Sequence, residues 1–301
     1  MLKNLIAAKH FTHEEDQYLE LIKDILKEGS METGRNGNVL TVYGSAMRFS
    51  LEHSKIPLLT TKRVAWKTCL KELLWFIQGK TDNKLLQEQN VKIWDGNSSK
   101  EYLESVGLPY EENDLGPVYG HQWRHFNAPY ETCHSNYDNK GIDQLQYVID
   151  LLKNPKTRQS RRIVMSAWNP CQINEMALPP CHVLVQFNVI QGNKLSCSLY
   201  QRSGDVGLGV PFNIASYSFL THIIGHFCKL EPYEFIYYLG NCHIYDDHIE
   251  SLKIQCKRIP IEFPTIDIDS KEYENINDYQ VSDIKINDYN HHSTISMEMR
   301  K

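Results

Sequence analysis

The segment between Ile214 and Phe227 constrains the fold of this chain more than any other. Its apolar residues recur at helical spacing and predict the most apolar helix in the sequence: Ile214, Tyr217, Leu220, Ile223, Ile224 and Phe227. A helix of this composition is expected to be buried on most of its sides. The remaining elements therefore have to pack around it.

Further helices are predicted where apolar residues keep a period near 3.6, at residues 18–26, 66–77 and 142–152. Strands are predicted at 39–44, 163–168, 183–190, 195–201 and 235–239, and Gln-Gly-Asn between the third and fourth of these indicates a hairpin. No repeat or low-complexity linker divides the sequence. We expect a single α/β (α+β) domain over residues 1–301, with helices packed on a mixed or antiparallel twisted sheet. We expect residues 1–13 to be an N-terminal extension and the polar tail after Pro264 to be a surface extension.

Charge and cysteine usage exclude several classes of protein. The net charge is −5 and the pI about 6.2, so no global positive field attracts nucleic acid or an anionic membrane. The sequence contains neither a signal peptide pattern nor an apolar run long enough to span a membrane. Eight cysteines are scattered without a CxxC pair, which indicates reduced thiols. We expect a cytoplasmic protein.

Cys181 is the first candidate for chemistry, in the sequence ALPPCH at residues 177–182. Two prolines fix the backbone there and remove two donors, so the thiol is expected at the mouth of a strand, facing a pocket. The alternative is a small buried apolar residue. A protease-like dyad with His182 is disfavoured because neighbours on a strand point to opposite faces. A zinc site is disfavoured because the usual ligand spacings are absent.

Four arginines lie where strands are predicted to begin or end: Arg35, Arg161, Arg162 and Arg202. Arginine matches phosphate oxygens with paired hydrogen bonds, so several converging arginines would clamp a phosphate and lower the pKa of a nearby thiol. Each arginine alone is as consistent with a solvated ion pair.

The third candidate is the stretch YQRSGDVGLGVPFN at residues 200–213. Its glycines allow the backbone to approach a ligand, and Asn213 is predicted as the N-cap of the apolar helix. An amide both donates and accepts, so it can read the edge of a pyrimidine. The glycine spacing fits neither a dinucleotide loop nor a P-loop. The alternative is a simple turn before a helix.

These stretches occur together with other motifs, in a fixed order: LTTKR (59–63), ELLWFIQG (72–79), VKIWDGN (91–97), DLGPVYGHQWRHF (114–126), DQLQYVIDLLK (143–153), RRIVMSAWNP (161–170) and LGNCHIYDDHIE (239–250). From about residue 14 to its C-terminus the chain resembles the thymidylate synthase family. The resemblance implies that family's fold. It also implies reductive methylation of deoxyuridylate (dUMP) to thymidylate (dTMP), with 5,10-methylenetetrahydrofolate giving both the carbon and the hydride. Dihydrofolate is the second product, and neither NADPH nor a metal takes part.

The resemblance also implies roles for individual residues. Cys181 corresponds to the nucleophile that adds to C6 of the pyrimidine. Glu72 corresponds to the carboxylate that organises proton transfers, Tyr119 to a hydroxyl near the C5 proton, and Asn213 to the amide that binds the uracil edge. Asp205 corresponds to the carboxylate that meets the pterin.

The remaining contacts implied by the resemblance divide between the two substrates. The dUMP contacts are Arg35, Arg161, Arg162, Arg202, Ser203, Gly204, Asp205, Asn213, His243 and Tyr245. Arg161 and Arg162 are expected from the partner subunit of a homodimer. The folate contacts are Ile93, Trp94, Asn97, Asp205, Leu208, Gly209, Phe212 and Arg300, and residues 265–301 are expected to close the site.

The sequence departs from the family pattern at three places. The turn around Arg35 is one residue shorter, Ala65 replaces a bulkier residue beside the folate tail, and Arg300-Lys301 stand where small or apolar residues are usual. One alternative is a deoxycytidylate hydroxymethylase of the same fold, which Asn213 disfavours because those relatives typically carry aspartate there. The other is a non-catalytic protein that regulates RNA. The intact Cys181 and Glu72 and the net negative charge disfavour it.

Overall fold

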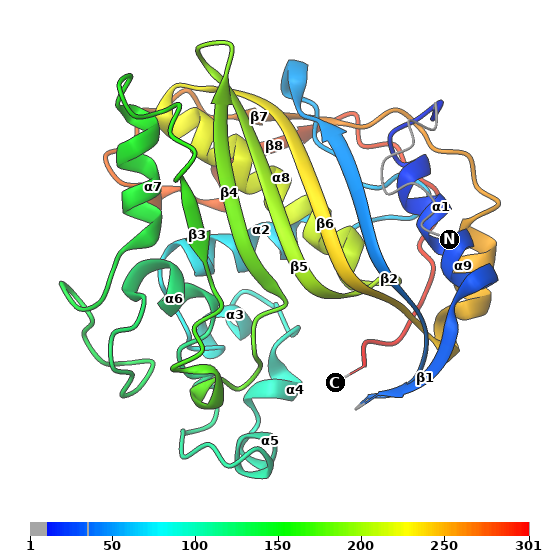
Figure 1. The fold of residues 1–301 in the computed structure, drawn as a ribbon, viewed down its shortest axis with the longest axis horizontal. Coiled ribbons are helices and arrows are strands. Elements are labelled where there is room, and N and C mark those ends of the chain that lie inside the picture. Colours follow the sequence, from blue (N-terminus) through cyan, green and yellow to red (C-terminus); the bar gives the residue numbers. More distant parts are fainter. Residues whose placement is uncertain (1–10, 35, 301) are drawn as a thin grey trace.

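The fold is a mixed α/β arrangement, seen in a computed structural model that describes residues 11–34 and 36–300 (Figure 1). The strands are β1 (Ser30–Gly34), β2 (Gly37–Ser50), β3 (Val164–Ser166), β4 (His182–Ile190), β5 (Lys194–Asp205), β6 (Glu231–Tyr245), β7 (Thr265–Ile268) and β8 (Ile284–Asn287). The helices are α1 (Asp16–Glu28), α2 (Trp66–Ile77), α3 (Lys84–Gln87), α4 (Asp95–Ser98), α5 (Lys100–Ser105), α6 (Tyr119–His125), α7 (Gln144–Lys153), α8 (Gly209–Cys228) and α9 (Ile249–Gln255).

Six strands form the main sheet, in the order β1-β2-β6-β5-β4-β3. Among the strands that the structure describes, only β5 and β6 pair in parallel, and the other pairs are antiparallel, so the prediction of a mixed sheet is confirmed. The predicted hairpin joins β4 to β5. The first two residues of its loop, Gln191 and Gly192, have φ of 51° and 88°, and positive φ at both positions matches the twist of the flanking strands.

Helix α8 covers one face of the sheet, and α2 packs beside it (Figure 1). Ile214, Leu220 and Ile223 on α8 are fully buried, as the apolar spacing predicted. Helix α2 occupies the predicted range, and Gly79 follows its end with φ of 71°, the left-handed conformation that commonly terminates a helix. Within the described ranges, no helix has both the length and the apolar character needed to cross a membrane.

No helix of the described residues covers the opposite face of the sheet, which stands in front of α8 in Figure 1. A row of large side chains crosses it, because Leu184 pairs with Tyr200 and Tyr200 pairs with Tyr238 in the strand register. These side chains are 36%, 39% and 41% exposed. Side chains this large and this exposed on adjacent strands are typical of a surface that contacts another protein.

The tail after Pro264 is not the surface extension that its polar composition predicted. It forms the two-stranded sheet of β7 and β8, and it buries Ile266, Ile276 and Tyr279 against the core. Apolar side chains are sparse in this segment, but several of them are placed at positions where the core covers them. The prediction failed because composition averages over such isolated anchors.

Candidate active site

A cavity of about 1160 Å³ opens where β2, β5 and β6 meet α2, α8 and the C-terminal segment. Small-molecule sites usually measure about 300–1,000 Å³. The cavity is therefore large enough for two ligands at once. Its wall contains residues from segments that are far apart in the sequence.

Cys181 lines the cavity directly before β4, at the strand mouth that the two prolines predicted. Its backbone N–H donates to the hydroxyl of Tyr119 at 2.8 Å, and the N–H of His182 donates to the same oxygen at 3.4 Å. Burial raises the pKa of Tyr119 well above its usual value, so the phenol keeps its proton. Tyr119 can then position the thiol through the backbone and still donate its own proton.

His182 also lines the cavity, so strand alternation does not separate it from Cys181 at this end of β4. Burial lowers the pKa of His182 to about 4, while a hydrogen bond with Asn213 opposes that shift. The imidazole is therefore neutral near pH 7.

Arg202 connects β5 to the turn that carries the thiol. Its Nε donates to the carbonyl of Pro180 and its Nη2 to that of Pro179, both at 2.9 Å. Two of the five N–H donors of the guanidinium hold the proline turn in this way, and others remain for a ligand in the cavity. Arg202 thereby places a positive charge close to Cys181.

The other residues expected around a phosphate are placed differently. Ser203 lines the cavity, whereas Gly204 is turned inward, where an added Cβ would lie 2.9 Å from side-chain atoms of Leu239 and Val210. The structure therefore does not bring Gly204 to the cavity wall. Arg161 and Arg162 are exposed just before β3 and do not line the cavity of their own chain. Arg35 lies outside the described residues.

Glu72 lies in the middle of α2 and is 6% exposed. The indole N–H of Trp94 donates to its Oε1 at 2.7 Å. Burial raises the pKa of Glu72 to about 7, and the Trp94 hydrogen bond opposes this shift. A carboxyl group with this pKa exchanges a proton readily near neutral pH, as a general acid or base requires.

Asn213 does not cap α8, because the helix already begins at Gly209. Pro211 stands in the first turn, where proline needs no hydrogen-bonded N–H and its fixed φ suits a helix, so the start lies upstream of the predicted position. Asn213 is instead a buried residue of the helix, 7% exposed, whose side chain lines the cavity and bonds His182.

Two residues without a role in the sequence analysis support the wall formed by β5 and β6. Gln201 is 2% exposed, accepts from the hydroxyl of Tyr237 at 2.6 Å and donates to the carbonyl of Ser203 at 2.8 Å. The alternation of β5 could have indicated it, since Gln201, Ser203 and Asp205 are spaced by two and all line the cavity.

Asn241 is the second such residue, and it fixes His243. Its Nδ2 donates to Thr41 at 2.7 Å, and its Oδ1 lies 3.0 Å from His243 Nδ1. An amide oxygen only accepts, so Nδ1 carries the proton. Burial lowers the pKa of His243, which keeps the ring neutral and leaves Nε2 as an acceptor. Tyr245 lies next to it, with ring centroids 5.4 Å apart.

The residues expected around a folate also converge. All of them line the same cavity: Ile93, Trp94, Asn97, Asp205, Leu208, Gly209, Phe212 and Arg300. Asp205 Oδ1 accepts from the N–H of Gly207 at 2.8 Å and lies 3.9 Å from Nδ1 of His248. The carboxylate is thus held at the end of β5.

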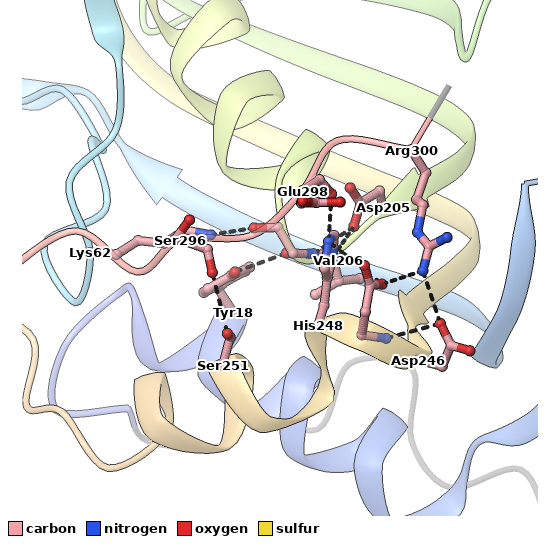
Figure 2. Close-up of polar contacts among 12 residues, drawn as sticks. Tyr18, Lys62, Asp205, Val206, Asp246, His248, Ser251, Ser296, Glu298 and Arg300 are labelled. Carbon is pink, nitrogen blue, oxygen red and sulfur yellow. Dashed lines mark hydrogen bonds and ion pairs between the residues drawn. The ribbon is translucent and has the colours of Figure 1, made fainter.

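The C-terminal segment forms one wall of the cavity, and polar contacts hold it in place (Figure 2). Ser251 donates to the carbonyl of Ser296 at 3.4 Å, and Nε2 of His248 lies 2.7 Å from the carbonyl of Glu298. Arg300 Nη2 lies 3.3 Å from the carboxylate of Asp246 and 3.0 Å from that of Asp247. We call residues 294–300 the cavity rim.

Comparisons with known proteins agree with this geometry. The family model described as "Thymidylate synthase" matches residues 16–301. The chain is 50% identical to "Thymidylate synthase 1/2" of Encephalitozoon cuniculi (strain GB-M1), over 95% of this chain and 97% of that protein. It is 50% identical to the "Bifunctional dihydrofolate reductase-thymidylate synthase" of Plasmodium chabaudi, over 98% of this chain and 50% of that protein. The enzyme of that name from Zea mays is also 50% identical, over 95% of this chain and 54% of its own length. The chain thus spans about half the length of these bifunctional relatives.

Proposed function

The chain belongs to the thymidylate synthase family and is a methyltransferase, and from that premise we propose how its cavity converts dUMP to dTMP with 5,10-methylenetetrahydrofolate. One observation carries the proposal. Cys181, Glu72, Tyr119 and Asn213 come from four separate segments and line one cavity, which the expected folate contacts share.

The reaction begins when the sulfur of Cys181 adds to C6 of the pyrimidine, which makes C5 an enolate-like carbon nucleophile. C5 attacks the methylene carbon of the folate and then loses its proton. Tetrahydrofolate leaves, its C6 hydride reduces the exocyclic methylene to a methyl group, and the sulfur departs. The products are dTMP and dihydrofolate, so the folate is both carbon donor and reductant.

Glu72 and Tyr119 are proposed to move protons during these steps. A pKa of about 7 at Glu72 suits a group that must both give and take a proton near the pyrimidine O4. The hydroxyl of Tyr119 bonds the backbone N–H of Cys181, which supports a position near the C5 proton. Asp205, at the end of β5, is proposed as the carboxylate that meets the pterin of the folate.

Recognition of the nucleotide is proposed to rest on three groups. Asn213 bonds the uracil edge, Arg202 and Ser203 hold the phosphate, and Nε2 of His243 with Tyr245 accepts the sugar 3′-hydroxyl. The fixed tautomer of His243 supports the last assignment. A deoxycytidylate hydroxymethylase is the competing function, and Asn213 in place of aspartate disfavours it.

We further propose a cytoplasmic homodimer in which Arg161 and Arg162 complete the phosphate site of the partner subunit. The row of Leu184, Tyr200 and Tyr238 on the open sheet face supports a contact between copies, and both arginines are exposed. All eight cysteines are present as thiols, which suits a reducing compartment.

Substrate specificity tests the proposed reaction. With tritium at C5 of dUMP, label should be released only when methylenetetrahydrofolate is present, with one dihydrofolate formed for each release. Turnover of deoxycytidylate to a hydroxymethyl product, at a rate equal to or above that of dUMP, would overturn the assignment.

Subunit mixing tests the shared site. Heterodimers of Arg161→Ala with Cys181→Ala subunits should regain about half of the activity of the parent dimer, because both defects then fall on one site and the other site is intact. Absence of any recovery, with heterodimer formation verified by mass, would mean that Arg161 acts within its own subunit or not at all.

A further inference from the structure

Three side chains capable of binding a metal lie together outside the cavity: Asp82, which follows α2, and Cys133 and His134 on the loop between α6 and α7. One ligand atom from each lies within 4.8 Å of the other two. None of the three lines the cavity. We infer that they bind one divalent ion of the zinc class, which ties this loop to the segment after α2.

The spacing between the Cys133 and His134 ligand atoms matches that of a tetrahedral zinc centre. Sγ of Cys133 lies 3.6 Å from Nε2 of His134. Zinc bonds of about 2.3 Å to sulfur and about 2.0 Å to nitrogen, at a tetrahedral angle, place those two atoms about 3.5 Å apart. His134 is exposed, so an ion can reach the site and a water molecule can take the fourth position.

Asp82 supplies the buried ligand. It is 8% exposed, and its Oδ1 accepts from the N–H of Lys84 at 2.8 Å, which fixes the carboxylate while leaving further lone pairs. One thiolate, one imidazole and one carboxylate together match the preference of zinc for mixed sulfur, nitrogen and oxygen ligands.

Asp114 holds the loop in the geometry that binding needs. Its Oδ2 accepts from the N–H of Cys133 at 2.9 Å, and its Oδ1 accepts from the hydroxyl of Tyr130 at 2.6 Å. Asp114 also pairs with Asp82 through a β-bridge. Asp82 and Cys133, on two separate segments, are therefore placed by contacts within the protein before any ion arrives.

The local charge also favours a cation. The carboxylate of Asp82 is itself one of the three candidate ligands, and that of Asp114 accepts from the backbone N–H of Cys133 at 2.9 Å. Two carboxylates beside the candidate ligands attract a positive ion.

The sequence analysis predicted no metal, because ligand spacing along the chain showed no zinc pattern. Asp82 belongs to a segment far from Cys133, and only the fold brings them together. The proposed ion has no part in the methyl transfer. Its effect is structural, and its test is independent of the proposed reaction.

Cobalt binding tests the inference in a Cys181→Ser background, which removes the thiol of the cavity. Titration with Co²⁺ should produce a thiolate-to-cobalt band in the near ultraviolet that saturates at one equivalent, and Zn²⁺ should displace it. Cys133→Ser should abolish the band, and His134→Ala should weaken binding at least tenfold. Cys171→Ser, which removes another exposed thiol, should leave the titration unchanged.

A saturating zinc concentration should also raise the Tm of the parent protein by a few degrees and that of Cys133→Ser not at all. His134→Ala provides the same comparison at an exposed position if Cys133→Ser does not fold. A band that persists in Cys133→Ser, or a parent protein that binds no cobalt, would overturn the inference.

Discussion

The cavity floor and the cavity rim are built in different ways. The floor consists of Glu72, Tyr119, Cys181 and Asn213, and its three residues on helices are at most 7% exposed. The rim, residues 294–300, has no regular secondary structure and is held by single hydrogen bonds and two partly exposed ion pairs. The packed core fixes the positions of the floor residues. The rim, in contrast, can detach from the rest of the protein at a small cost in free energy. We expect substitutions in the floor to abolish or redirect the chemistry and substitutions in the rim to change only affinity.

The largest effect should follow from Cys181→Ala. Without the sulfur, C5 is not activated, so kcat should fall about 10⁴-fold or more. Binding of dUMP, measured by calorimetry, should persist because Arg202 and Asn213 remain. Cys171→Ser serves as the control and should keep full activity. Activity retained by Cys181→Ala would identify a different nucleophile.

Asn213→Asp should change which base the floor accepts. A carboxylate cannot donate to the uracil O4, so kcat/KM for dUMP should fall about 10²-fold to 10³-fold. Deoxycytidylate, which has a donor at that position, should become the better substrate. Competition between the two nucleotides measures the ratio directly. An unchanged preference would place base recognition elsewhere.

Glu72→Gln should change the pH dependence of stability. Burial raises the pKa of Glu72 from 4.5 to about 7, so the folded protein holds this proton between those values while the unfolded chain releases it. The contribution of Glu72 to stability is therefore present below pH 4.5 and is lost as the pH rises to 7.

Glutamine stays neutral, so the stability of the variant relative to the parent should rise by about 3 kcal/mol between pH 4 and pH 8. Denaturant unfolding of the ligand-free proteins measures this difference. Other titrating groups, such as His182, are common to both proteins and cancel. Parallel stability profiles would show that Glu72 is not desolvated.

The smallest effect is expected for Arg300→Ala in the rim. Its partners Asp246 and Asp247 are partly exposed, and such pairs contribute about 0–1 kcal/mol. KM for the folate should rise about twofold to fivefold with kcat unchanged, and the difference should shrink at high salt. Lys253→Ala breaks a comparable surface pair with Glu250 away from the cavity and should have no effect. A large loss of kcat would show that the rim takes part in catalysis.

The elements that could be predicted from the sequence are those with strong local signals. Helices α1, α2 and α8 and the β4–β5 hairpin followed from periodic apolar residues and from turn residues, which are local signals. Strand β1 was not predicted, because Ser30–Gly34 is exposed throughout and carries no apolar alternation. The buried anchors of the tail were missed for the opposite reason, since each is a single apolar residue among polar ones.

For the site, too, residues within a recognisable motif could be predicted, and residues that act only through contacts in the fold could not. Motif residues such as Cys181 and Glu72 could be named from their sequence context. Gln201 and Asn241 were not assigned, because their function is to orient Ser203 and His243 through contacts that only the fold creates. The candidate metal ligands Asp82 and Cys133 were missed for the same reason.

The most direct test of the account is a covalent complex with 5-fluoro-deoxyuridylate and methylenetetrahydrofolate. Fluorine at C5 cannot leave as a proton does, so the reaction should stop with sulfur, pyrimidine and folate joined. Mass spectrometry of the digested complex should find nucleotide and folate together on the peptide that contains Cys181. An adduct on another residue, or no adduct under conditions of full binding, would contradict the assignment of Cys181 as the nucleophile.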